Sequence, residues 1–245
     1  MLVLLPPSET KAEGGSGAPL DLDLLSHPEL NPVRDKLVDA LVDLAADVPA
    51  SLAALGLSER QSGEVARNAE LRRSPTLPAL ARYTGVLYDA LAPGSFTGVE
   101  RERAFRRLAV ASALFGLLGG GDPVPAYRLS GGSALPATGP FAALWRPALE
   151  PLLAVADDFV VDLRSSPYTS FARVPGAVVV RVVTEDARGR RNAVSHFNKA
   201  HKGRLARALV RSRAEPADLR GLVRVVTRAG FRLEPTGPRA ADLVV

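Results

Sequence analysis

Hydrophobic and polar residues alternate along this chain in blocks that predict both strands and helices. Leu2–Leu5 is a short apolar run followed by two prolines, which cannot continue a sheet ladder, so we expect a first strand there. Phe159–Leu163 and Ala177–Val183 are dense in valine and are the clearest internal strands. The segment Asp186–Arg191 predicts a hairpin turn, and Asn192–Ser195 predicts a short returning strand.

Apolar residues at helical spacing predict several helices. After Asn31-Pro32, Val33–Asp47 carries such a pattern, and Phe141–Ala154 carries another that places Trp145 in the core. The remaining predicted helices are residues 79–91, 99–114, with a basic face of Arg101, Arg103, Arg106 and Arg107, and 199–212. Residues 223–228 predict a helix end or a strand, and residues 230–235 a last strand.

Residues 51–73 predict two helices joined by a tight turn. Gly56 lies in the turn, and Ser58 is a good N-cap for the second helix. The unit resembles a helix-hairpin-helix module, whose turn exposes backbone amides to a DNA phosphate. Hydrophobic-Gly-hydrophobic turns also join helices in purely structural pairs, so both interpretations stand.

These elements predict a single α+β domain over residues 1–245, with a mixed β-sheet surrounded by helices and the helix-hairpin-helix-like element at 51–73. Residues 8–19 are rich in Gly, Ser and charge and predict an exposed loop. No repeat or convincing linker divides the chain. The apolar start is too short for a secretory signal, and no run has the length to cross a bilayer.

Composition adds constraints on chemistry. The chain of 245 residues is 47% hydrophobic and 23% charged, which is ordinary for a globular protein. Cysteine is absent, which excludes thiol catalysis, thiolate metal sites and disulfides. The net charge is +5, and 27 of the 31 basic residues are arginine, so each of the four lysines stands out.

Positive charge is concentrated near the C-terminus. Between Arg181 and Arg213 there are ten basic residues against two acidic ones, whereas between Asp21 and Asp47 seven acidic residues face two basic ones. The segment 194–213 holds Lys199 and Lys202 at a predicted strand-to-helix junction, where a helix N-terminus favours an anion. The alternative is a solvated cationic helix, which fits the arginines at 204, 207 and 211 better than it fits the junction.

The sequence gives little support for a metal site, a phosphate-binding loop or a catalytic serine. His196 and His201 are five residues apart with no acidic neighbour, so a zinc site is not expected. The run Gly119–Asp122 lacks the lysine and Ser/Thr of a P-loop, which favours a helix stop and turn over a phosphate cradle. No nucleophile-elbow pattern occurs. We therefore expect no metal and no cofactor.

Six motifs in order resemble the YaaA family of peroxide-stress proteins. They are LVLLPPSETK at 2–11, YTGVLYDAL at 83–91, LFGLLGGGDPVPAYRLSGG at 114–132, LWRPAL at 144–149, DLRSSPYTSF at 162–171 and VSHFNKAHKGRLAR at 194–207. The resemblance covers essentially the whole chain. It implies a cytoplasmic protein with a mixed sheet, a helix-hairpin-helix element, a positively charged DNA-binding cleft, and a role in limiting damage from peroxide and iron.

The matching positions imply which residues line that cleft. They are Lys11, Tyr83, Tyr88, Asp122, Tyr127, Arg128, Ser165, Tyr168, Ser195, Lys199, Lys202 and Arg207. Two departures matter. Pro167 stands where many members have glutamate, which weakens any role for that carboxylate as a general base. Lys202 replaces the usual arginine and loses bidentate phosphate geometry.

Two functions therefore stand. The first is a DNA-binding protein that contacts duplex or distorted DNA through phosphates, with steep salt dependence. The second is an enzyme acting on a nucleobase or nucleotide in the same cleft, with Lys199 or Asp122 near the reacting atom. Iron sequestration by the protein itself is disfavoured, because three histidines and a basic cleft suit iron poorly. The oligomeric state and any catalytic residue stay open.

Overall fold

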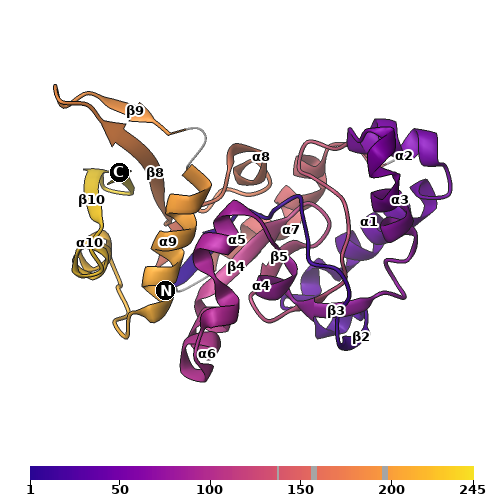
Figure 1. Ribbon diagram of the computed structural model, residues 1–245, viewed down its shortest axis with the longest axis horizontal. Coiled ribbons are helices and arrows are strands. Elements are labelled where there is room, and N and C mark those ends of the chain that lie inside the picture. The colour runs from indigo at the N-terminus through magenta and orange to yellow at the C-terminus, as the bar shows by residue number, and fades with distance from the viewer. Residues whose placement is uncertain (137, 156–158, 195–197) are drawn as a thin grey trace.

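A twisted eight-stranded sheet runs through the centre of the molecule in the computed structural model, which describes residues 1–136, 138–155, 159–194 and 198–245 (Figure 1). The main path of the sheet has the order β10-β11-β8-β7-β1-β4-β5, and β9 pairs with β8 beside it. The strands are β1 (Leu2–Leu5), β4 (Leu108–Ser112), β5 (Gly116–Gly119), β7 (Val160–Asp162), β8 (Val178–Glu185), β9 (Arg191–Ala193), β10 (Arg232–Gly237) and β11 (Ala240–Val244). The predicted mixed sheet surrounded by helices is confirmed.

The middle of this sheet is parallel. β1 pairs in parallel with β4 on one side and with β7 on the other, and β8 and β11 continue the parallel part. The chain leaving β1 next enters this sheet at β4, whereas the chain leaving β7 goes the other way, to β8. The carboxyl ends of the neighbouring strands β1 and β7 therefore form a topological switch point, where open α/β sheets hold their ligands.

Helices cover the sheet, and three of them lie beyond it at one end of the molecule (Figure 1). The helices are α1 (Asn31–Leu44), α2 (Val48–Leu55), α3 (Ser62–Ala69), α4 (Ala79–Arg82), α5 (Val86–Leu91), α6 (Gly98–Arg107), α7 (Phe141–Ala154), α8 (Ser166–Thr169), α9 (Asn198–Arg211) and α10 (Leu219–Arg228). Figure 1 shows α1, α2 and α3 gathered at one end of the molecule and α10 at the other. A small sheet is formed by β2 (Gly17–Pro19), β3 (Pro75–Pro78) and β6 (Pro123–Val124), with β2 and β3 at the same end of the molecule as α1 (Figure 1). None of the described helices is long and apolar enough to cross a membrane.

The predicted helix at 99–114 is wrong in its second half. α6 ends at Arg107, and Leu108–Ser112 forms β4, a central strand with every residue buried. A run that is apolar on all sides satisfies a buried strand as well as a buried helix, so its periodicity could not separate the two. Gly119 accordingly ends a strand, not a helix.

The structure contains the predicted pair of helices at 51–73. α2 ends at Leu55 and is capped by Gly56, whose φ of 65° is left-handed, and Ser58 forms a capping box with Gln61 at a short 3₁₀ turn before α3. Three arginines of this unit pair with carboxylates: Arg67 with Glu13 and Glu64, Arg72 with Asp35 and Asp39, and Arg73 with Glu70.

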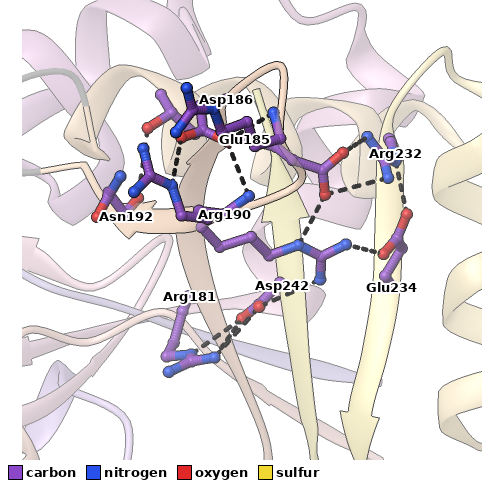
Figure 2. A network of polar contacts seen from close by, with 11 residues as sticks. Arg181, Glu185, Asp186, Arg190, Asn192, Arg232, Glu234 and Asp242 are labelled. Atoms are coloured by element: carbon purple, nitrogen blue, oxygen red, sulfur yellow. Dashed lines mark hydrogen bonds and ion pairs between the residues drawn. The ribbon is translucent and has the colours of Figure 1, made fainter.

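An ion-pair network holds the C-terminal strands to the β8–β9 hairpin (Figure 2). Arg191 of β9 pairs with Glu185 of β8, Glu234 of β10 and Asp242 of β11. Arg181 also pairs with Asp242, at 2.8 Å, and Arg232 pairs with Glu185. Because these side chains come from four strands, the network fixes this edge of the sheet with polar contacts.

Candidate functional site

A cleft of about 470 Å³ opens at the carboxyl ends of β1 and β7. Its walls come from four segments: residues 6–9 after β1, residues 130–132, residues 165, 167 and 168 after β7, and Asn198, Lys199 and Lys202 of α9. Because the two strands flank the switch point, the loops that follow them diverge there and leave a crevice. The volume lies in the range of small-molecule sites.

Two lysines of α9 reach this cleft in different ways. Lys202 is 8% exposed, and its Nζ donates hydrogen bonds to the carbonyl oxygens of Leu163, at 2.9 Å, and Arg164, at 3.3 Å. Burial lowers the pKa of Lys202, and the charge of Asp162 opposes that shift. Lys199 is exposed, so its ammonium is free to meet an anion. Lys202 thus fixes the loop after β7, whereas Lys199 offers charge.

Asn198, the first residue of α9, brings an open acceptor to the cleft. Its Oδ1 atom is buried and accepts no hydrogen bond from any residue that the structure describes. A buried acceptor without a donor is costly, and ligand sites commonly contain such atoms. Asn198 therefore offers a position for an N–H or O–H group of a bound molecule.

Another part of the cleft wall is built around Tyr168. The hydroxyl of Tyr168 accepts a hydrogen bond from the backbone N–H of Gly131 at 3.0 Å. A Cβ on Gly131 would lie 3.1 Å from that of Pro167, so the two segments approach too closely for most side chains. Burial raises the pKa of Tyr168, which keeps its hydroxyl protonated.

Behind the loop after β1, Lys11 is enclosed by aromatic rings. It is 7% exposed, and its Nζ donates to the carbonyl oxygens of Ser8, at 3.1 Å, and Glu9, at 3.3 Å. The same atom lies 4.1 Å from the ring centroid of Tyr127. Burial, reinforced by the positive charge of Arg128, lowers the pKa of Lys11 from 10.5 to about 7. The loop at residues 8–19, which was predicted to be exposed, therefore contains one buried lysine side chain.

A chain of hydroxyl groups continues this layer. The hydroxyls of Tyr83 and Tyr127 lie 2.7 Å apart, and Tyr127 is also 2.7 Å from the hydroxyl of Ser112 at the end of β4. Tyr88 donates to the carbonyl of Pro6 at 2.9 Å. Burial raises the pKa of all three tyrosines, so they stay neutral. Their contacts hold the loop after β1 from behind.

Glu9 is the acidic residue that lines the cleft. Its carboxylate pairs with Arg128 at 2.7 Å, while the backbone of Arg128 exchanges hydrogen bonds with the side chain of Asn68 in α3. The negative charge is thus matched, and the cleft is tied to the helical end of the molecule.

Comparison with known proteins identifies the family. A sequence model of the family described as peroxide stress protein YaaA matches residues 1–236. The chain belongs to the YaaA family. Relatives named UPF0246 protein include one from Corynebacterium efficiens, 46% identical over 100% of this chain and 99% of its own. Others come from Corynebacterium glutamicum, at 43% over 100% of both chains, and Streptomyces coelicolor, at 42% over 97% and 94%.

The positions implied by resemblance to the YaaA family divide into groups. Four of them line the cleft: Ser165, Tyr168, Lys199 and Lys202. Five form the layer behind it: Lys11, Tyr83, Tyr88, Tyr127 and Arg128. Ser195 lies outside the described residues, as does His196.

Asp122 and Arg207 lie elsewhere. Asp122 follows β5, whose last residue Gly119 pairs with Ala109 near the start of β4, away from the carboxyl ends that form the cleft. Its carboxylate accepts hydrogen bonds from the backbone N–H groups of Ser26 and Gly119. Arg207 donates to the carbonyl oxygen of Leu91 at 2.9 Å. These hydrogen bonds within the protein explain the positions of both side chains, and neither side chain lines the cleft.

Several cleft residues escaped the sequence interpretation. Pro6 and Glu9 were visible only as the end of a strand and the start of a loop, whereas Asn198 and Lys199, which the sequence places together at the strand-to-helix junction, do line the cleft together. The useful signal for Pro6 and Glu9 was their position directly after a buried strand, which places them at the ligand-binding edge. Within the described parts of the chain, no group of three His, Asp or Glu side chains is placed to hold a metal ion.

Proposed function

We propose that this YaaA-family protein binds DNA through the cleft at the β1–β7 switch point and thereby serves in the response to peroxide. The peroxide role rests on the family, and the DNA contact rests on the cleft. The carrying observation is the placement of Lys199 and Lys202 at the amino end of α9, where the cleft opens and the helix dipole favours an anion.

Charge balance in the cleft supports a phosphate ligand. Glu9, the acidic residue of its walls, is neutralised by Arg128, so the exposed Lys199 is not offset. Phosphate contacts of this kind position a DNA backbone without reading its sequence.

The turn between α2 and α3 is a secondary candidate for DNA contact. The carbonyl of Ala54 in α2 accepts a hydrogen bond from the N–H of Ala134, so this helix pair adjoins the segment that lines the cleft. The ion pairs of Arg67, Arg72 and Arg73 lower their value for phosphate binding. Arg60 is exposed beside the turn and is the arginine to test there.

A nucleotide-processing enzyme is the second candidate. The cleft has the volume of a small-molecule site, and the buried Oδ1 atom of Asn198 leaves an acceptor for a base or sugar group of a bound nucleotide. Such an enzyme binds a mononucleotide well, whereas a backbone binder needs an oligomer.

The test is binding of labelled duplex, bubble and single-stranded DNA across a salt series. We expect Lys199→Ala to weaken binding about three- to tenfold and to reduce the salt slope by about 0.9, the loss of one duplex phosphate contact. Lys36→Ala is the matched control, because Lys36 is an exposed lysine on α1. Lys202 is avoided because its bonds to Leu163 and Arg164 hold the cleft in shape.

Equal affinities for wild type and Lys199→Ala would remove the cleft from the DNA interface. If no DNA form binds at moderate salt while a mononucleotide does, the enzyme is the better description.

A further inference from the structure

A second basic depression lies between α9 and α10, apart from the cleft. It is an open groove of about 510 Å³. Four arginines line it: Arg204, Arg207 and Arg211 from α9 and Arg228 from α10. No carboxylate belongs to its described walls.

The four guanidinium groups differ in availability. Arg207 bonds the carbonyl oxygens of Leu91 and Ala92, and Arg211 pairs with Glu100 at 3.2 Å. Arg204 and Arg228 are exposed, and neither makes a hydrogen bond or ion pair with any described residue. One free cation thus stands on each wall.

Apolar residues also line the groove. Ala208, Val225 and Phe231, called the floor below, are among them, and Phe231 is half-buried. Paired bases are stacked inside a duplex, so a duplex backbone brings only phosphates and sugars and gains little from such a floor. An unpaired strand presents phosphates and base faces together, which suits arginine walls and an aromatic floor.

We propose that the α9–α10 groove binds an unpaired DNA strand that continues from the DNA held in the cleft. The inference rests on the proposed DNA binding. α9 belongs to both sites: Lys199 faces the cleft, and Arg204 lies about 8 Å further along the helix axis, on the groove side. Five residues also turn Arg204 about 140° around the axis from Lys199, so a strand that leaves the duplex at the cleft reaches the groove after a few nucleotides.

The expected loss of affinity for single-stranded DNA follows from the two free arginines and the ring of Phe231. The variant Arg204→Ala/Arg228→Ala removes two phosphate contacts, which lowers the salt slope for single-stranded DNA by about 1.4. Phe231→Ala removes the stacking surface and weakens binding of an unpaired strand by about tenfold, within the range of one base–aromatic stack.

The experiment compares a blunt duplex with the same duplex carrying a single-stranded tail of about ten nucleotides. We expect wild type to prefer the tailed DNA, and both groove variants to lose that preference while keeping wild-type affinity for the blunt duplex. Arg220→Ala/Arg224→Ala is the matched control, because both are exposed arginines on α10 outside the groove. The control keeps the tail preference.

Each contrary result has a distinct meaning. If the blunt duplex does not bind wild type, the proposed function fails, and the inference fails with it. If the duplex binds but the tail adds nothing, or if the control loses as much as the groove variants, only the inference is overturned. Competition by a mononucleotide at concentrations similar to the tail also overturns it, because the groove is then a small-molecule site.

Discussion

The side chain of Lys11 shows how burial changes one residue. Its ammonium contacts two carbonyl oxygens and a tyrosine ring, and the side chain is buried. Carbonyl and ring contacts favour the charged form, but burial and the charge of Arg128 dominate and lower the pKa to about 7. A residue that is ordinarily a solvated cation thus becomes a titrating group near neutrality.

Lys11 is expected to make stability depend on pH. Between about pH 7 and pH 10 the unfolded chain binds a proton on Lys11 that the folded protein does not, so the free energy of unfolding rises with pH. The rise reaches at most about 1.4 kcal/mol per pH unit. Lys11→Met should flatten it, as measured by urea unfolding between pH 7 and 9. Lys36→Met is the control and keeps the wild-type rise; an unchanged slope in Lys11→Met would contradict the assignment.

At the scale of single residues, the sequence identified residues of the site region but not which of them line the cleft. Lys11 and Tyr127 belong to the site region, but they lie behind the loop that the cleft exposes. The distinction depends on which side of the loop after β1 each side chain lies, and no local pattern encodes that. Asp122 shows the same limit, because its two backbone hydrogen bonds come from positions 26 and 119.

At the scale of elements, the crossing of α5 and α9 positions the cleft. Gly203 lies where the two helices touch: a Cβ there would overlap the carbonyl oxygen of Leu87 and lie 2.9 Å from the Cβ of Ala90. The close approach places the amino end of α9, with Lys199, beside the loop after β1. A small residue is therefore required at this position.

Gly203→Ala should destabilise the protein by about 1–3 kcal/mol, because the backbone of α5 cannot yield as a flexible side chain does. Gly63→Ala is the control: Gly63 lies in α3 with nothing within 4 Å of the added Cβ, so the variant should be neutral or up to about 1 kcal/mol more stable. Thermal unfolding of both variants checks the difference. Equal melting temperatures would show that α9 shifts without cost.

At the scale of the whole molecule, buried arginines join distant segments. Arg34 is fully buried, and its guanidinium bonds the carbonyl oxygens of Phe115 and Leu117 and those of Ser26 and His27. Arg82 and Arg107 act in the same way elsewhere, so the predicted basic face of 99–114 is wrong at Arg107, which is 1% exposed. Arginine is rarely buried without such partners.

The bonds of Arg34 to Phe115 and Leu117 should stabilise the packing of α1 on the sheet, within a molecule that unfolds as one unit. We expect one transition by both far-UV circular dichroism and the fluorescence of Trp145, which packs against the sheet at Gly116. Arg34→Met leaves several carbonyl groups unsatisfied and should lower the free energy of unfolding by about 3 kcal/mol or more, with both probes still coincident. Arg224→Met, at an exposed position on α10, is the control. Separate transitions in wild type would contradict the predicted single domain.

The sequence by itself determined the strongly patterned elements and the family. Phe141–Ala154 begins and ends as predicted, because its apolar spacing is regular and a proline precedes it. The valine-rich strands were also found, with small shifts at their ends. The motifs sufficed for the family because their order along the chain is itself sequence information.

Only the tertiary structure decided where chemistry is brought together. Leu108–Ser112 became a strand because its place between β1 and β5 buries both faces, which no local signal reports. The cleft joins residues 6–9, 130–132, 165–168 and 198–202, segments that are far apart in the chain. The physical reason is that strand order and helix crossing arise from long-range packing, whereas a sequence pattern reports only the preferences of neighbouring residues.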